Sequence, residues 1–365
     1  MLLDFFPSWR LTIYLAKMFA IRIVAVLAML VLVLLMLDLL GKTGDILEIP
    51  GNGQAEVLKY ASLRGPQLLS RFLPYSVLLA TIITLAGLNQ NSEVIAMKAA
   101  GLSAHQILAP LLLIGAIVAG VSFAFNERVV TRANATLSAW ENVDFAEVPD
   151  EPSSRGNVYY NDGRDVLMAR SAAGRGDRTR FTDVSFYERD DNGMIVRQVT
   201  ADAAVFADPG WRLANARAFD VATARERDLG TVTLAEGVTI GQVELGRVNA
   251  DAETLGQLSR SIEALQSAGR RTGELEAKWW HKLAGPLSAV LMPLLGAVAG
   301  FGLARSGNLF VRAVIGMALG FAYFVVDNAA LAMGSFGGYP PLLAAWAPFV
   351  LFLLVGETVL VRTEE

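Results

Sequence analysis

The sequence predicts an integral membrane protein of six transmembrane helices, with a jellyroll-like all-β domain inserted between the third and the fourth helix. Three observations lead to this fold class. The composition is apolar, with 53% hydrophobic residues and a mean hydropathy of +0.43. The apolar residues gather in six long runs, and the region between the third and fourth runs is charged and alternates like short strands.

Each apolar run is long enough to cross a membrane, because a hydrocarbon core of about 30 Å needs about 20 mostly apolar helical residues. The first run is too long for the apolar region of a signal peptide and no clear cleavage site follows it, so we expect a permanent span. The predicted spans are 15–40, 67–88, 106–126, 283–304, 310–334 and 341–361.

The region between spans three and four has a different composition. Residues 127–277 contain 18 Arg, no Lys and 25 Asp or Glu. Short runs such as 180–188 alternate between apolar and polar residues, and Asp-Gly, Asp-Asn-Gly and Asp-Pro-Gly turn signals separate them, which indicates antiparallel strands. We expect a sandwich, jelly roll or barrel, with helical or irregular connectors at 127–150 and 252–277.

The chain therefore divides into residues 1–126 with three spans, 127–280 with the β domain, and 281–365 with three further spans. Lys and Arg near the ends of spans favour the cytoplasmic side. With the N-terminus inside, seven such residues lie inside and four outside. This bias predicts cytoplasmic termini, a β domain outside the inner membrane, and a cytoplasmic segment at 89–105.

Residues 89–105 connect two spans but have the apolar spacing of a short amphipathic helix rather than a simple turn. Such a helix suits docking onto a soluble partner, and the alternative is a helix lying flat on the membrane interface. The sequence contains no Gly-x-x-x-x-Gly-Lys-Ser/Thr motif, so it has no phosphate-binding loop of that kind. Any ATP chemistry is therefore expected from a partner.

Four segments together resemble the lipopolysaccharide-export permeases of the LptF/LptG family, and the resemblance covers essentially the whole chain. They are NQNSEVIAMKAAGLS (89–103), PLSAVLMPLLG (286–296), FAYFVVDNA (321–329) and GYPPLL (338–343). The first is the most specific. Asp327, followed by two prolines, resembles LptG more than LptF.

The resemblance implies a permease subunit that is not itself an enzyme. It implies a dimer of an LptB-like ATPase that binds ATP and Mg²⁺, a second permease of LptF type, and an LptC-like protein with one span and a β-jellyroll. The complex would take lipopolysaccharide from the inner membrane and pass it to a bridge of β-jellyrolls. It implies no cofactor in this chain and no nucleic-acid partner.

The resemblance also assigns roles to the residues of the 89–105 segment. Glu93 would form an ion pair with a basic residue in a groove of the ATPase, and Ile95 and Met97 would fill its apolar floor. Gly101 would end the helix, because glycine readily adopts the left-handed conformation at a helix C-terminus. The alternative for Glu93 is an ordinary solvated charge. The predicted coupling residues are Glu93, Val94, Ile95, Met97, Lys98 and Gly101.

A binder of lipid A needs an apolar cavity with cations at its rim. Lys42 matches one basic position at the end of the first span that contacts lipid phosphates in LptG-like proteins, whereas Leu35 and Gly41 stand where relatives have bases. The alternative for Lys42 is a residue that anchors the span at the membrane surface. The predicted lipid-binding residues are Lys42, Asp38, Arg71, Phe72 and Arg132.

Ionisable residues inside spans are costly and tend to face protein or water. We expect structural roles for Asp38 and Asp327, and Asp327 could cap a helix or pair with a cation from the partner subunit. Two Gly-x-x-x-Gly patterns let helices approach closely, either between spans four and five or with the paired permease. The predicted helix-packing residues are Gly296, Gly300, Gly316, Gly320 and Asp327.

Two other functions fit parts of the sequence. One is a membrane sensor or scaffold whose β domain binds a ligand. The other is an integral membrane hydrolase, but neither a Gly-x-Ser-x-Gly nor a His-Glu-x-x-His motif occurs, and His281 stands beside Trp279 and Trp280, which suit an interfacial belt. With two histidines and no cysteine, no metal site is expected. The acidic β domain could enclose acyl chains or have a filled core.

Overall fold

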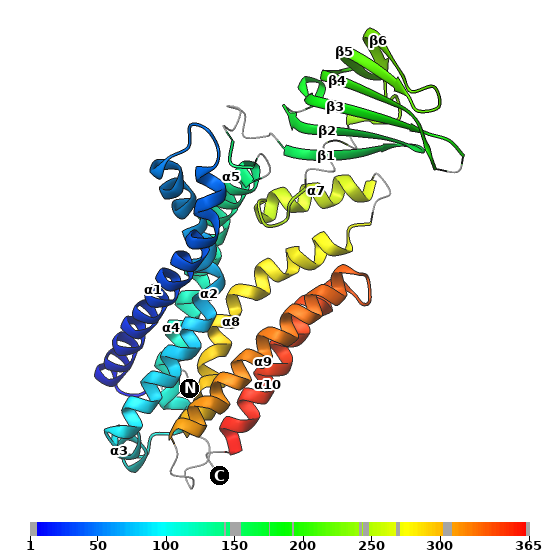
Figure 1. Ribbon diagram of the computed structural model, residues 1–365. Coiled ribbons are helices and arrows are strands. Elements are labelled where there is room, and N and C mark those ends of the chain that lie inside the picture. The colour runs from blue at the N-terminus through cyan, green and yellow to red at the C-terminus, as the bar shows by residue number, and fades with distance from the viewer. Residues whose placement is uncertain are drawn as a thin grey trace. The chain divides into compact units, whose positions relative to one another are not determined.

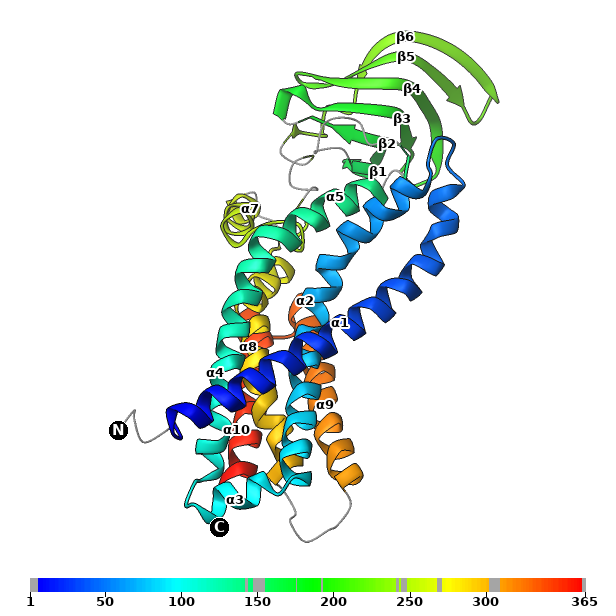
Figure 2. The ribbon, with the colours of Figure 1, turned by 90° about the vertical axis from the view of Figure 1, so that its left-hand side faces the viewer.

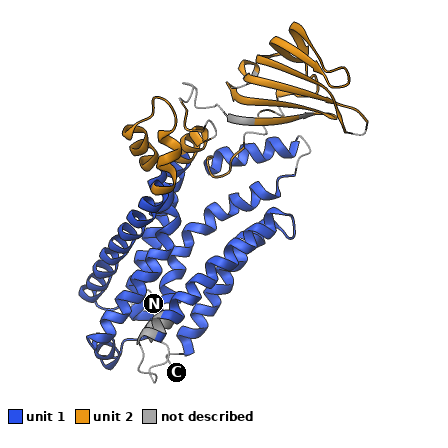
Figure 3. Ribbon diagram, in the orientation of Figure 1, with its two compact units in different colours: residues 1–39, 64–131, 254–365 blue, residues 40–63, 132–253 orange. Residues whose placement is uncertain are grey.

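The structure is a computed structural model, and the chain folds into two compact units (Figure 3). The helical unit comprises residues 1–39, 64–131 and 254–365, and the sheet unit comprises residues 40–63 and 132–253. The described residues are 6–141, 144–146, 155–174, 176–191, 193–240, 243, 248–267, 271–301 and 309–362.

Long helices make up most of the chain outside residues 142–254 (Figure 1). Their bounds are α1 Trp9–Leu47, α2 Gln54–Gln90, α3 Glu93–Ala99, α4 Ala104–Phe125, the π-helical turn η1 Asn126–Val130, α5 Thr131–Glu141, α7 Leu255–Ser267, α8 Gly273–Phe301, α9 Leu309–Ser335 and α10 Pro341–Arg362.

Five of the six predicted spans coincide with helices that are long and apolar enough to cross a membrane. These lie within Trp9–Leu47, Gln54–Gln90, Ala104–Glu141, Val314–Ser335 and Pro341–Arg362. The span predicted at 283–304 falls on α8 and continues into residues 302–304, which lie outside the described residues. The chain is therefore a multi-pass membrane protein with a β domain between its helices.

The core of the helical unit is built from the inward faces of its long helices. Fully buried side chains come from α1, α2, α4, α8 and α9, and include Leu15, Phe19, Leu85, Ile107, Leu111, Leu291, Leu295 and Tyr323. The buried hydroxyl of Thr81 bonds back to its own helix, donating to the Val77 carbonyl at 2.8 Å, whereas the buried Thr84 hydroxyl on the same helix has no partner in the described part of the chain. The Thr81 bond satisfies a polar group where a bilayer offers no water.

The predicted β domain is present as one six-stranded antiparallel sheet with the strand order β1-β2-β3-β4-β5-β6. The strands are β1 Arg155–Asp162, β2 Asp165–Ala173, β3 Arg180–Arg189, β4 Ile195–Ala207, β5 Gly210–Asp220 and β6 Arg225–Leu234, with a 3₁₀ turn η2 at Gly176–Arg178. Each predicted turn signal lies between two paired strands. The described strands form a meander, a simpler order than the two Greek keys of a jelly roll.

One face of this strongly bent sheet (Figure 2) carries a continuous apolar core. Its fully buried members include Leu167, Phe181, Val199 and Leu213. Trp211 closes the core, because its indole N–H donates to the carbonyl of Val238 at 2.7 Å and its ring packs 4.1 Å from that of Phe181. Within the described residues this interior is filled with side chains. This agrees with the expectation of a filled core rather than of an interior that encloses acyl chains.

A second contact holds the segment after β6 against β1. The backbone N–H of Gly237 donates to the carboxylate of Asp162, and burial raises the pKa of that carboxyl. A Cβ atom at Gly237 would overlap the Asp162 side chain. A side chain at this position would therefore displace the Asp162 carboxylate from its place beside Gly237.

We predict that Trp211→Phe loosens the sheet, because it removes a buried hydrogen bond and leaves the Val238 carbonyl unsatisfied, a change worth about 1–3 kcal/mol. Amide hydrogen exchange of the full-length protein measures this as lower protection in β5 and residues 235–240. Trp9→Phe is the matched control, since Trp9 is 77% exposed. Equal protection in the Trp211→Phe variant and the unmodified protein would contradict the assignment.

Candidate functional site

The 89–105 segment folds as the separate short helix α3, at the same end of the helical unit as the C-terminus (Figures 1 and 2). Gly101 has a φ of 86°. The Leu102 N–H donates to the Met97 carbonyl at 3.1 Å, and the Gly101 N–H donates to the Lys98 carbonyl at 3.0 Å. These two bonds form a Schellman motif, which confirms that Gly101 ends the helix in the left-handed conformation.

The helix α4 begins directly after this turn. The Ser103 hydroxyl accepts the Gln106 N–H at 3.1 Å, and the Gln106 side chain accepts the Ser103 N–H at 3.0 Å. This reciprocal pair is a capping box. Specific hydrogen bonds therefore close the turn between α3 and α4 on both sides.

The faces of α3 differ from one another. Val94 and Met97 are buried in the helical core, at 5% and 8% exposure. Ile95 is 66% exposed, and Lys98 is also exposed. Met97 is expected to fill the apolar floor of a partner's groove, but it packs inside its own chain. Ile95 is the large apolar side chain of α3 that remains exposed.

Glu93, at the start of α3, has a partner within the chain that the sequence did not indicate. The Tyr14 hydroxyl on α1 donates to its two carboxylate oxygens, at 3.2 and 3.4 Å. The two residues are 79 positions apart in sequence. No periodicity or motif pairs them, so only the packing of α1 beside α3 brings them together.

A further polar contact joins α4 to α10 near this end. His105 Nε2 lies 2.9 Å from Glu357 Oε1, and their side chains are 25% and 48% exposed. His105 comes two residues after the α4 cap residue Ser103. The end of the unit that carries α3 thus has polar contacts to α1 and α10 in addition to its apolar core.

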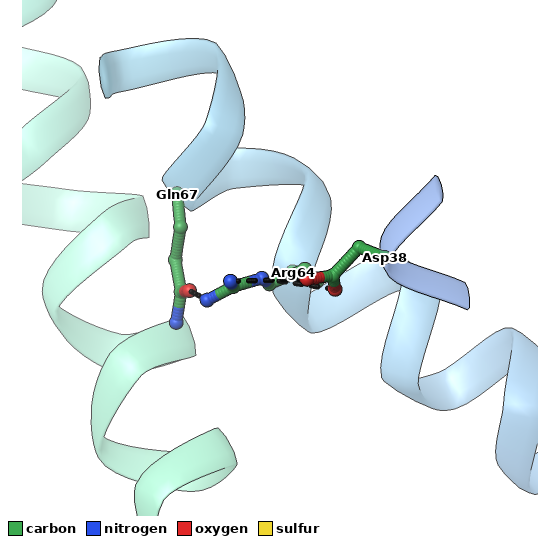
Figure 4. Close-up of polar contacts among 3 residues, drawn as sticks. All are labelled: Asp38, Arg64 and Gln67. Atoms are coloured by element: carbon green, nitrogen blue, oxygen red, sulfur yellow. Dashed lines mark hydrogen bonds and ion pairs between the residues drawn. The ribbon is translucent and has the colours of Figure 1, made fainter. Parts of the chain in front are cut away.

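A second polar cluster ties α1 to α2 (Figure 4). The Arg64 guanidinium donates to both carboxylate oxygens of Asp38, at 3.1 and 3.2 Å, and to the Gln67 side-chain oxygen at 2.6 Å. The Asp38 and Arg64 side chains are 22% and 31% exposed. Such bidentate geometry is the strong form of an ion pair, and it gives Asp38 the structural role expected of it.

Lys42, one turn beyond Asp38 on α1, belongs to the sheet unit. Its ammonium lies 2.9 Å from the Asp45 carboxylate and 5.9 Å from the centre of the Phe145 ring. It lines a cleft of about 550 Å³ together with Asp45, Glu48, Ile49, Glu141, Asp144 and Phe145. Four carboxylates around one ammonium make this cleft unfavourable for a free phosphate.

The other predicted lipid-binding residues are placed separately. Arg71 on α2 is exposed, and so is Arg132 on α5. Phe72 is half-buried, with its ring 5.6 Å from that of Tyr75. Arg71 and Phe72 belong to the helical unit and Arg132 to the sheet unit.

Asp327 on α9 is paired within its own chain rather than at a helix end. Its carboxylate lies 3.0 Å from His281 Nε2 on α8, and the Asp327 side chain is 10% exposed. Neighbouring Trp279 donates its indole N–H to the Leu255 carbonyl at 3.3 Å. The aromatic pair predicted as an interfacial belt therefore lies beside a polar link between α8 and α9.

The π-helical turn η1 after α4 positions a cap that sequence reasoning missed. Both carboxylate oxygens of Glu127 accept the Leu255 N–H, at 3.1 and 3.0 Å, where α7 begins. An acid is favourable there because the first N–H groups of a helix lack partners. π-Helical turns often mark functional positions, and this one places the Glu127 carboxylate at the first residue of α7.

The glycine patterns of α8 and α9 face α2. A Cβ on Gly296 would lie 2.7 Å from Thr81 Cγ2, and one on Gly320 would overlap the Leu78 side chain. Gly316 is also buried, whereas the surroundings of Gly300 lie outside the described residues. Gly296 and Gly320 thus approach α2, while α8 and α9 also pack against each other as expected.

We predict that Gly101→Ala weakens the α3–α4 turn, because a residue with a Cβ in the left-handed region costs about 1–2 kcal/mol. Hydrogen exchange of the α3 amides should accelerate by about 5- to 30-fold. Gly120→Ala is the matched control, since a Cβ there meets nothing within 4 Å and the residue is helical. Unchanged exchange in α3 would mean that another conformation ends the helix without strain.

We predict that Asp38→Asn or Arg64→Gln each lowers stability by about 1–3 kcal/mol, less than for a fully buried pair because both groups are partly exposed. Thermal unfolding in nanodiscs should show that the double variant loses less than the sum of the two single variants. The exposed pair Lys42 and Asp45 provides the control, with an expected effect of about 0–1 kcal/mol. Additive losses at Asp38 and Arg64 would show that the two side chains do not interact.

The comparison with known proteins agrees with this architecture. A family described as "Lipopolysaccharide export system permease LptF/LptG" matches residues 13–362. The lipopolysaccharide export system permease protein LptG of Escherichia coli K12 is 24% identical over 328 residues, which are 87% of this chain and 89% of that protein. LptG of Haemophilus influenzae is 24% identical over 309 residues, 81% of this chain and 83% of that protein. The chain therefore belongs to the LptF/LptG family of lipopolysaccharide export permeases.

Proposed function

We propose that the chain is an LptG-type permease subunit of an ABC-type exporter. It extracts lipopolysaccharide from the inner membrane and passes it to a periplasmic bridge of β-jellyroll domains. One observation carries the proposal beyond the family. The seven-residue helix α3 lies between two spans, is closed by a Schellman motif, and has Ile95 and Lys98 on its exposed side.

The exposed side of α3 is the proposed docking site for an LptB-like ATPase dimer, which would bind ATP and Mg²⁺. Ile95 would enter an apolar groove, and Glu93 would pair with a base at its edge. Val94 and Met97 have the opposite task, because their packing in the helical core carries a displacement of α3 to the spans. Gly101 keeps the following turn stiff.

The proposed orientation places α3 and both termini in the cytoplasm and the sheet in the periplasm of a bacterial inner membrane. The excess of Lys and Arg on the short loops of the α3 side supports it. Further partners would be an LptF-type permease and an LptC-like protein with a single span. The two edge strands of the sheet, β1 and β6, are where a neighbouring sheet could add its strands.

In the helical unit, the exposed guanidinium group of Arg71 is proposed to meet a lipid phosphate, with Phe72 beside the acyl chains. Arg132, in the sheet unit, is proposed separately as a second phosphate-binding residue. Lys42 would bind a lipid phosphate only after its ion pair with Asp45 is broken. Asp38 would act indirectly by holding Arg64. This arrangement uses arginines, whose planar fork matches phosphate oxygens.

The first experiment is purification of the tagged, full-length chain from its native host in a mild detergent, followed by identification of stoichiometric partners. An ABC ATPase and a second permease of similar layout are expected. A chain that purifies alone, or with a kinase or another regulator, would instead support a membrane sensor.

We predict that Glu93→Lys lowers retention of the ATPase at least about tenfold, because it places a positive charge opposite the partner's base. Quantitative mass spectrometry of the purified complex measures the ratio of ATPase to permease. Glu226→Lys is the control, since Glu226 is an exposed acid on β6. Full retention in Glu93→Lys would remove α3 as the docking site.

A further inference from the structure

The helix α1 is attached unevenly to the helical unit. Its first half is packed into the core, with Leu15 and Phe19 fully buried and Ile23 at 3% exposure. Of residues 24–40, which are all described, only Val31 is buried. The exposed apolar side chains of this second half are Val24, Met29, Leu32, Val33, Met36, Leu37 and Leu40.

Polar contacts between side chains of α1 and the rest of the helical unit supplement this packing. Tyr14 bonds to Glu93 on α3, Arg22 donates to the Ile83 carbonyl on α2 at 3.2 Å, and Asp38 pairs with Arg64 on α2. The Tyr14 contact alone ends on the helix proposed to dock the ATPase. It lies one residue before the buried Leu15, at the base of the packed half of α1.

The hydrogen bond between Tyr14 and Glu93 has the geometry of a weak bond. Its two distances, 3.2 and 3.4 Å, exceed the usual 2.7–2.8 Å of a hydroxyl–oxygen bond, and Tyr14 is 46% exposed. A cation on a partner would compete for the same carboxylate with an ion pair, in which the donor as well as the acceptor is charged. Glu93 can therefore be taken from Tyr14 by a partner that reaches it from the exposed side of α3.

We propose that Tyr14 is a positioning residue that shares Glu93 with the docked partner, so that docking releases the base of α1. The inference rests on the proposed function and adds a regulatory link to the same site. When the partner withdraws Glu93 from Tyr14, α1 loses a polar contact at its base and its exposed half gains freedom to move. Linkage makes the effect reciprocal, because whatever displaces α1 also frees Glu93 for the partner.

The first test uses the chain without partners in nanodiscs. The sequence has no cysteine, so Leu37→Cys on α1 and Val121→Cys on α4, both more than 60% exposed, accept the only two spin labels. Double electron–electron resonance should give a broader or shifted distribution of distances between the two labels for Tyr14→Phe and for Glu93→Gln. The double variant should show no further change, because both substitutions remove one contact.

The matched control is Tyr339→Phe. The Tyr339 hydroxyl contacts Sδ of Met333, a residue of α9, at 3.6 Å. This variant should leave the distance distribution unchanged. A distribution in Tyr14→Phe that equals that of the unmodified chain would overturn the link between Tyr14 and α1, whatever the partner is.

The second test measures docking of the co-purified ATPase on immobilised permease. Loss of a competing hydrogen bond should tighten docking about 2- to 10-fold in Tyr14→Phe, whereas Glu93→Gln weakens it. Unchanged or weaker docking in Tyr14→Phe, with weaker docking in Glu93→Gln, would overturn the sharing of Glu93 and leave the proposed function intact. If both variants docked the ATPase as tightly as the unmodified chain does, the proposed docking site on α3 would itself be wrong.

Discussion

The bilayer imposes the constraint on which the helical unit depends, because backbone polar groups in hydrocarbon must find partners within the chain. Only continuous helices meet that condition in a chain of this kind. Three polar side chains in the spans follow the same rule: Thr81 bonds to its own helix, Asp38 to Arg64 and Asp327 to His281. Each of these contacts satisfies a group that a lipid would leave unpaired, and the last two also tie helices together.

Close packing around α8 is the second organising feature of the helical unit. Gly296 and Gly320 bring α8 and α9 against α2, and Gly115 brings α4 against the backbone of α8, where a Cβ would lie 2.7 Å from the Ala289 carbonyl oxygen. By contrast, α1 exposes most of its outer half. A rigid group of helices beside one loosely held helix suits a transporter, in which one element must move while others keep their place.

The α3 helix connects these two features. Its buried side joins the rigid group through Val94 and Met97, its end is fixed by the turn at Gly101, and Glu93 reaches α1 through Tyr14. One short helix thus touches both the rigid core and the loosely held span. A turn without a helix would have neither the exposed surface for a partner nor the fixed geometry to pass on a movement.

The sequence by itself determined five of the six predicted spans, the inserted antiparallel domain and the end of α3, because hydropathy, alternation and glycine at a left-handed position act over a few neighbouring residues. It also identified Asp38 and Asp327 as residues in need of partners. Only the tertiary structure decided that the partners are Arg64 and His281, that Met97 points inward, that Lys42 lies among acids and that Tyr14 meets Glu93. These contacts join residues from different helices, and their identity follows from how the helices pack, which no local pattern records.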